Sequence, residues 1–369
     1  MQQQRIYYLD ILRTIAIISI TLNHAVNRSF DVYINQMDEF QSIPIGQTIL
    51  KTLFCTFSRL GVPLFLMITG ALLLPRDYTN DNKFIKHNWL RLFVITEIWL
   101  IIMFWYKQFL PGSILLSHGL TICLIRFVMT LLFLNPVSFG NMWYMYMILC
   151  AYLMIPFLAL GLKKLKIIYF VIPCTIVLFC SFLQPDINAF FNALGFKNTF
   201  STQLDSINIF SMFVVLMLLG YLSANKYFAK VPTAILALLL FVSFVLYNIF
   251  QLWIFSIDFD YVVGQGYHSL YPVLVSVFLF ELIRRMESFF DIRIVRSCIM
   301  ELSITSFGIF FIHICIMDGL NSVIKHFNLP VTYFIKLVIL EIVSFLCSVF
   351  IIEIFKKNRW MSKYLFGIR

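Results

Sequence analysis

The sequence predicts an all-α fold: a polytopic membrane helix bundle of about ten transmembrane helices plus one re-entrant or interfacial helix. Hydrophobic residues make up 61% of the 369 residues, and the mean hydropathy is +0.89, which soluble globular chains of this size do not reach. The apolar residues gather into runs of about 20, the length that crosses a bilayer as a helix. These runs follow one another without a detectable repeat or a soluble appendage, so we expect one membrane-embedded domain over 1–369.

Apolar length predicts each span in turn, with short polar links between them. The stretch 113–134, which carries Arg126, is apolar enough for an eleventh span. A crossing there would move the basic link at 163–166 to the opposite side, so we interpret it as a re-entrant or interfacial helix. Pro63 predicts a kink in the second span. The ten expected spans are 7–26, 48–74, 89–110, 141–161, 167–183, 205–224, 232–254, 267–284, 302–323 and 331–355.

The formal net charge of +10 does not indicate a nucleic-acid partner. Most Lys and Arg residues fall in the links that a ten-span topology puts on one side, together with both termini. This bias is the positive-inside rule, so we expect a multi-pass protein of the cell membrane with both termini cytoplasmic. The first span has almost no basic n-region and no A-x-A cleavage pattern, and we expect it to be retained.

No pattern for a metal or a nucleotide-binding loop occurs in the sequence. The eight cysteines lie in apolar runs without C-x-x-C spacing and are expected to be buried small hydrophobes. H-E-x-x-H, P-loop and G-x-G-x-x-G motifs do not occur. We therefore expect no bound metal.

The first span carries three ionisable residues: Asp10, Arg13 and His24. Arg13 and His24 share one face of a helix and lie ~16 Å apart at ~1.5 Å per residue. Asp10 lies one turn before Arg13 on the same stripe. Buried charges in a membrane are costly and tend to face a bundle interior or a wet cavity. We therefore expect His24 to act as a general base and Arg13 as an anion anchor. A histidine bonded to a neighbouring helix and an Asp10–Arg13 ion pair are the simpler alternatives.

Four further groups in the spans are candidates, each with a structural alternative. Arg59 is a second deep guanidinium, and Glu97, Glu281 and Glu341 are possible partners for the arginines. Thr69 precedes Gly70, a pair that serves either chemistry or close helix packing. Trp143 and Tyr144 open a span and form either an interfacial belt or a stacking wall. His313 lies in mid-span, where a lone histidine is most often structural.

Four motifs, in order along nearly the whole chain, resemble those of the acyltransferase-3 family of integral-membrane acyltransferases. Tyr8, Asp10, Arg13 and His24 match its Tyr-x-Asp-x-x-Arg opening and Arg-x10-His motif. SRLGVPLFLMITGALLL resembles S-R-x-x-V-P-L-F-F-M-I-S-G-Y, MWYMYMILCAYLMIPFL resembles L-W-F-x(n)-Y-L-x-x-P, and SFGIFFIH resembles S-x-G-I-Y-x-x-H. The likeness is greatest to the branch typified by the enterobacterial common antigen O-acetyltransferase. Thr69, Ala71 and Phe310 depart from the pattern; Phe310 lacks the hydroxyl of the usual tyrosine.

The resemblance implies an acyl-CoA-dependent O-acyltransferase. It would move an acyl group, most simply acetyl, from cytoplasmic acetyl-CoA or another acyl-CoA to a hydroxyl of a cell-surface glycan or lipid-linked sugar. His24 would be the general base or an acyl relay. Basic residues at the inner mouth, including Arg91, would bind the CoA phosphates, with Arg13 and Arg59 further in. The expected supporting residues are Asp10, Thr69, Glu97, Trp143, Tyr144 and His313.

Two other function classes compete with this prediction. A transporter or exporter of a polysaccharide or small molecule would also have ten spans with buried charges, although we detect no inverted repeat. A ligand-binding sensor without chemistry is a third possibility. If the enzyme interpretation is right, one continuous tunnel should run from the basic inner mouth to a cavity at His24.

Overall fold

The computed structural model describes residues 5–30, 44–79, 83–109, 113–134, 141–196, 200, 212–255 and 267–368. Within these ranges every regular element is a helix, which confirms the predicted all-α class. The helices are α1 (Tyr7–Ser29), α3 (Ile45–Ser58), α4 (Gly61–Leu73), η1 (Ile85–Trp89), α5 (Leu90–Gln108), α6 (Ile114–Leu131), α7 (Met142–Lys164), α8 (Ile168–Val177), η2 (Leu178–Leu183), α9 (Gln184–Ala193), α10 (Met212–Ala224), α11 (Thr233–Phe255), α13 (Leu270–Arg285), η4 (Glu287–Phe290), α14 (Arg293–His326), α15 (Tyr333–Phe355) and α16 (Arg359–Tyr364).

Several of these helices, alone or joined to the next one, are long and apolar enough to cross a membrane. Nine such segments occur in the described residues, and they identify the chain as a multi-pass membrane protein. Each of the ten predicted spans contains a helix, but two helices are short: α10 has 13 residues and α13 has 16. The first part of the expected span 205–224, residues 205–211, lies outside the described residues.

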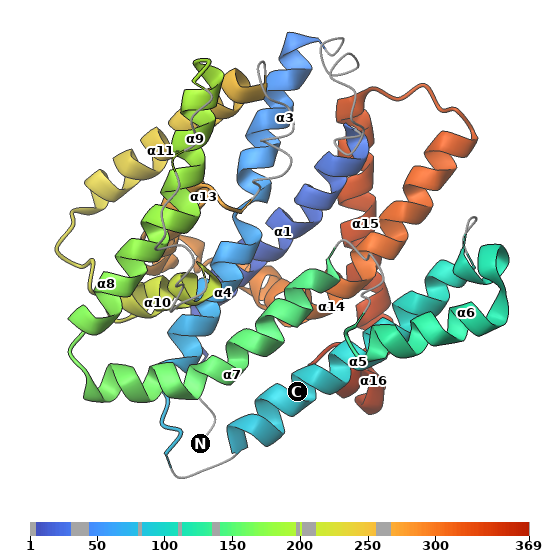
Figure 1. Cartoon of the computed structure of the whole chain (residues 1–369), viewed down its shortest axis with the longest axis horizontal. Helices are drawn as coiled ribbons and strands as arrows, with labels where there is room; N and C mark the ends of the chain where they lie inside the picture. Colours follow the sequence, from blue (N-terminus) through green and yellow to red (C-terminus); the bar gives the residue numbers. More distant parts are fainter. Residues whose placement is uncertain are drawn as a thin grey trace.

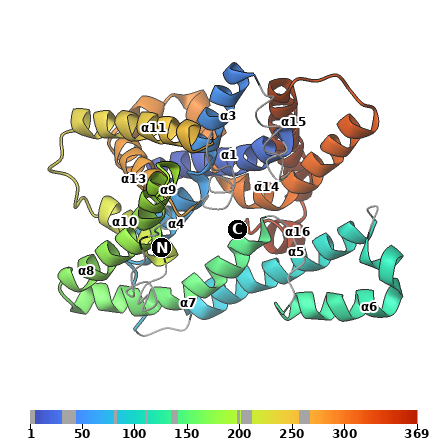
Figure 2. The ribbon, with the colours of Figure 1, turned by 45° about the horizontal axis from the view of Figure 1, so that its top comes forward.

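The first helix forms the centre of the bundle, where it contacts α3, α4, α13, α14 and α15 (Figures 1 and 2). In its most apolar window 83% of the residues are buried, compared with 11% in α6. The close approach to α4 depends on Gly61, because a Cβ there would lie 2.5 Å from Cγ1 of Ile20. This position explains how α1 can carry charged residues, since they face protein and not lipid.

The second predicted span is interrupted shortly before Pro63, where the sequence predicted a kink. The helix is interrupted at Arg59–Leu60, between α3 and α4. Pro63 lies in the first turn of α4, where a missing backbone N–H removes no helical hydrogen bond. The break leaves Arg59 between the two helices.

Helix α6 corresponds to the stretch 113–134 and returns along α5. The Leu115 amide donates to Oε1 of Gln108 at 3.1 Å, and the rings of Phe133 and Phe93 lie 6.0 Å apart. Both views show α6 beside α5 at the margin of the bundle (Figures 1 and 2). The end of α7 nevertheless lies on the face where α5 begins, because Lys163 forms an ion pair with Asp77 of the α4–η1 link. By length and composition α6 is also one of the nine segments that could cross a membrane, so its re-entrant or interfacial placement stays a prediction.

The two ends of the described chain lie on the same face of the molecule. Nη2 of Arg5 donates to the carbonyl of Met300, and Lys356 forms an ion pair with the adjacent Glu301. Both contacts are in the first third of α14, near its amino end. An even number of membrane crossings requires this arrangement.

Candidate functional site

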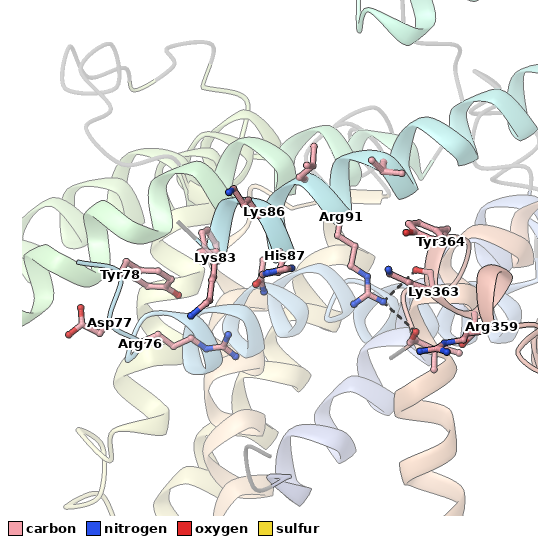
Figure 3. Close-up of a pocket in the computed structure, with 16 residues that line it drawn as sticks. Arg76, Asp77, Tyr78, Lys83, Lys86, His87, Arg91, Arg359, Lys363 and Tyr364 are labelled. Carbon is pink, nitrogen blue, oxygen red and sulfur yellow. Dashed lines mark hydrogen bonds between the residues drawn. The ribbon is translucent and has the colours of Figure 1, made fainter. Parts of the chain in front are cut away.

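A cavity of about 890 Å³ opens on the face of the molecule that carries the chain ends. We call it the basic mouth (Figure 3). The α4–η1 link, the start of α5 and the segment around α16 line it. Among the described residues of this lining, Asp77 is the one carboxylate and six side chains are cationic: Arg76, Lys83, Lys86, Arg91, Arg359 and Lys363.

The charge of Asp77 is already compensated within the link. The Thr79 amide donates to Oδ1 of Asp77 at 3.0 Å and the Thr79 hydroxyl at 2.8 Å. Lys163 lies 3.1 Å from Oδ2. These contacts, the Thr79 amide first, lower the pKa of Asp77 to about 2. Asp77 is therefore ionised at neutral pH but matched by Lys163, and the mouth keeps a strongly positive lining that suits a polyanion.

A second cavity of about 420 Å³, the inner cavity, continues from the basic mouth into the bundle. Arg76, His87, Asn88 and Arg91 line both cavities, so the two adjoin. The walls of the inner cavity come from α1, α4, α5, α7 and α14. Further inside it is lined by Arg13, Thr69, Tyr144, Tyr152 and Phe310.

Asp10 holds Arg13 at the wall of the inner cavity. Nη1 of Arg13 lies 3.2 Å from Oδ1 of Asp10, which also accepts from the Ser303 hydroxyl at 2.6 Å. Arg5 forms an ion pair with the other oxygen of the same carboxylate. Asp10 is almost completely buried, whereas 32% of the Arg13 side chain is exposed. The predicted Asp10–Arg13 pair therefore exists, and the partly exposed guanidinium still faces the cavity.

His24 lies three turns further along α1, beside His313 of α14. The two ring centroids are 5.3 Å apart, and the planes are tilted by 45°. Nδ1 of His313 lies 2.7 Å from the carbonyl of Ile309, to which it donates. Nε2 of His313 is buried and has no hydrogen-bond partner in the described part of the chain. It can therefore accept a hydrogen bond or a proton at the His24 ring.

Arginine side chains surround the histidine pair. Arg28 donates to the His24 carbonyl at 3.2 Å and forms an ion pair with Asp318 at 2.6 Å. Arg59 lies over the ring of Tyr267, 5.4 Å from its centroid, and the hydroxyl of the preceding Ser58 donates to Oδ1 of Asn23, next to His24, at 3.4 Å. Arg59 thus belongs to the histidine end of the site, whereas Arg91 belongs to the mouth and Arg13 lies between them.

The two residues of the Thr69–Gly70 pair face different surroundings. Thr69 lines the inner cavity, and its hydroxyl donates to the carbonyl of Phe65 at 2.8 Å. Gly70 faces α10 instead, where a Cβ would lie 1.8 Å from the carbonyl oxygen of Met217. The glycine permits the helix contact, and the threonine remains available to the cavity.

The two aromatic residues at the start of α7 differ in exposure, because Tyr144 is partly buried and Trp143 is 37% exposed. Tyr144 lines the inner cavity with its ring 5.6 Å from that of Phe310. Trp143 lies 5.5 Å from the ring of Tyr267, on the side of Arg59. Tyr144 therefore lies where the stacking-wall interpretation requires it, in the lining of the inner cavity. Trp143 lies instead beside Tyr267, the residue whose ring Arg59 covers.

The three glutamates differ in their surroundings. Glu281 forms ion pairs with Arg284 and Arg285 at 2.7 and 3.2 Å. Glu97 is half-buried, lines neither cavity and forms no ion pair within the described ranges. Oε1 of Glu341 accepts from the Thr21 hydroxyl at 2.6 Å, one turn before His24. The pairing of Glu341 with α1 had no signal in the sequence, because the two residues are 320 positions apart.

The two cavities account for part of the expected tunnel. Phe310 lines the inner cavity, and His313 follows one turn later on α14. His24 and His313 line neither the basic mouth nor the inner cavity. The continuous section thus extends from the mouth to the Tyr144–Phe310 wall.

No group of three or more His, Cys, Asp or Glu side chains that could hold a metal occurs among the described residues. The eight cysteines are all unpaired thiols. Cys150, Cys298 and Cys347 are exposed on the helix surfaces and not buried as expected, because apolar helix faces of a membrane protein contact lipid.

Comparison with known proteins gives one match. The family described as "Acyltransferase domain", of the acyltransferase-3 type, matches residues 6–353. No match was found among curated proteins or among solved structures. The family match covers both cavities apart from the segment around α16.

Proposed function

The chain belongs to the acyltransferase-3 family, and from this membership we propose that it is a membrane O-acyltransferase. The proposed donor is a cytoplasmic acyl-CoA, most simply acetyl-CoA, and the acceptor is a hydroxyl of a cell-surface glycan or lipid-linked sugar. One observation carries the proposal: a strongly basic mouth adjoins a smaller cavity that is lined further inside by Arg13 of α1. A CoA ester has its parts in the same order, with phosphates at one end, then a slender pantetheine arm, then the thioester.

The donor would bind from the cytoplasmic side, where acyl-CoA is made. Arg91 would contact the phosphates at the junction of the two cavities, and Arg13 would contact the polar groups of the arm. Thr69 and Tyr144 line the same passage. Asp10 supports this arrangement because it fixes Arg13 at the cavity wall. Glu97 contacts neither substrate in this proposal.

The proposed chemical step is an attack of the acceptor hydroxyl on the thioester carbonyl carbon. His24 takes the hydroxyl proton as the new C–O bond forms. The C–S bond then breaks, and the proton passes to the departing thiolate, which leaves His24 neutral. A relay, in which His24 first accepts the acyl group and then passes it to the hydroxyl, balances equally.

His313 and Arg59 support His24 in this step. The lone pair on Nε2 of His313 can hold the His24 ring in one orientation. Arg59 can stabilise the negative charge that develops on the carbonyl oxygen, an effect that is large in a site without bulk water. The Trp143–Tyr267 pair next to Arg59 presents aromatic faces on which a sugar ring could stack.

Acetyl transfer by the purified protein in lipid nanodiscs tests this proposal. Acetyl-CoA labelled in its acetyl group is incubated with candidate glycans and lipid-linked sugars. The expected result is label in one acceptor class and an equal amount of free CoA thiol. Two results together would instead identify a transporter: the thioester stays intact with every acceptor, and unmodified glycan crosses the membrane of vesicles that contain the protein.

A further inference from the structure

The family match ends at residue 353, but the chain continues back into the site. Residues 359–368, the C-terminal segment, comprise α16 and the residues after it. Arg359, Ser362, Lys363, Tyr364 and Ile368 line the basic mouth, and Phe366 and Gly367 line the inner cavity. A part of the chain beyond the family match thus completes both cavities.

Specific contacts fix this segment in place. The indole of Trp99 donates to the carbonyl of Leu365 at 2.8 Å. Phe366 is only 2% exposed, and a Cβ on Gly308 would lie 3.0 Å from its ring. Gly367 has φ +63°, which favours glycine, and places the chain against Phe307. The segment is therefore a built wall of the site.

The C-terminal segment also orients Arg91. Nη2 of Arg91 donates to the carbonyls of Lys363 and Ile368 at 3.4 and 3.3 Å (Figure 3). Arg91 is one of the residues shared by the two cavities. The segment therefore sets a guanidinium at the entrance of the inner cavity.

The mouth carries its cations in two groups on opposite sides. In Figure 3, Arg76, Lys83 and Lys86 lie on the side of the α4–η1 link, and Arg359 and Lys363 lie on the side of α16. Arg359 and Lys363 form no ion pair within the described ranges. Tyr364 lies beside them, with the Lys363 ammonium 4.7 Å from its ring centroid. Two separated basic groups fit a ligand with two separated phosphates.

We propose that the C-terminal segment binds the adenosine 3′-phosphate end of the donor, an inference that rests on the proposed function. The pantetheine arm enters the inner cavity, so the diphosphate attached to it lies at the shared residues Arg76 and Arg91. The 3′-phosphate and adenine are on one ribose at the far end. A site with two cations and an aromatic ring, as in Arg359, Lys363 and Tyr364, matches that combination. The segment thereby distinguishes CoA from a donor that lacks the 3′-phosphate.

The test compares the binding of CoA and 3′-dephospho-CoA to the full-length protein. In the double variant Arg359→Gln/Lys363→Gln, the preference for CoA over dephospho-CoA should fall about tenfold, the size of one lost charged contact. The preference should persist in Arg359→Lys/Lys363→Arg, which keeps both charges. Lys357→Gln is the matched control, because Lys357 is exposed nearby but does not line the mouth.

Each outcome decides one point. An unchanged preference in the Gln double variant, or an equal loss of both ligands in a protein of normal thermal stability, overturns the assignment of the 3′-phosphate. An increase in CoA affinity would identify the segment as an obstruction and overturn it as well. If the wild-type protein binds no CoA at all, the proposed function itself is refuted. If it binds CoA, but the Gln double variant keeps the same preference for CoA over dephospho-CoA, only the assignment of the 3′-phosphate is refuted.

Discussion

At the scale of single residues, the buried polar groups of α1 are distributed over its length and each has a distinct environment. Asp10 and Arg13 form a network near the mouth face that Arg5 and Ser303 complete. His24 is three turns away, beside His313 and in contact with Arg28, which donates to its carbonyl. In the proposed function, this separation would divide a single helix into an anion-binding part and a proton-accepting part.

Replacement of His24 by alanine should abolish acyl transfer. Loss of a general base typically lowers turnover by ~100–10,000-fold. CoA affinity should change little, because His24 does not line the two cavities to which we assign the donor's phosphates and arm. Turnover is followed as thiol release, and binding by titration with CoA. Near-normal turnover in His24→Ala would remove His24 from the mechanism.

Replacement of Arg13 by alanine should weaken acyl-CoA binding by about tenfold. Loss of a buried charged partner costs ~3–5 kcal/mol, but the Arg13 side chain is 32% exposed, so the effect is smaller. The fold should survive, since Asp10 keeps its contacts with Arg5 and Ser303. Arg13→Lys should restore little, because an ammonium lacks the planar fork. Unchanged affinity in Arg13→Ala would assign Arg13 to structure alone.

The sequence predicted which single residues line the site better than it predicted which distant residues they contact. Helical periodicity placed Asp10 next to Arg13, and the ion pair is present. Two other contacts join residues that are far apart in the sequence: His24 with His313, and Thr21 with Glu341. They depend on how the helices pack, and the local spacing of residues does not encode this packing. Arg359, Lys363 and Tyr364 follow the last span and read as ordinary basic flanking residues, so their position in the mouth needed the fold.

At the scale of helices, the length of an apolar run predicted reliably that a helix is present, and less reliably where that helix begins and ends. A helix occurs in each of the ten predicted spans. The segment predicted as 167–183 continues without interruption through α8, η2 and α9 to Ala193. Polar residues such as Gln184 and Asp186 suggested a link, but Asp186 accepts from the Leu270 amide at 2.9 Å inside the protein. A buried hydrogen bond to another helix therefore extends this one.

The crossing of α4 and α10 gives a prediction at this scale. A Cβ at Gly70 would lie 1.8 Å from the carbonyl oxygen of Met217, so Gly70→Ala must separate two helix backbones. Overpacking of this kind costs ~1–3 kcal/mol or more, and we expect a clearly lower Tm. Gly319→Ala in α14 is the control, because nothing lies within 4 Å of its Cβ position. Equal Tm values for the two variants would contradict the observed packing.

At the scale of the whole molecule, the contacts of Arg5 and Lys356 place both described ends on one face, and the basic mouth opens there. The positive-inside rule then predicts that this face is cytoplasmic. A cysteine at position 357 should be protected from an impermeant thiol reagent in intact cells, and a cysteine at position 326, the far end of α14, should be labelled. Lys357→Cys and His326→Cys are compared with a parent chain that lacks the native cysteines. The reverse labelling pattern would invert the orientation.

The central claim is that the donor enters by the basic mouth and reaches His24 through the bundle. The most direct test uses sealed vesicles that contain protein of one orientation. Acetyl-CoA does not cross the bilayer, so it can be supplied on one side only. We predict that labelled acetyl groups are transferred when the donor faces the mouth, also to an acceptor confined to the opposite side. The His24→Ala protein should transfer none. Transfer that requires donor and acceptor on the same side, or that proceeds when acetyl-CoA is supplied only opposite the mouth, would contradict this account.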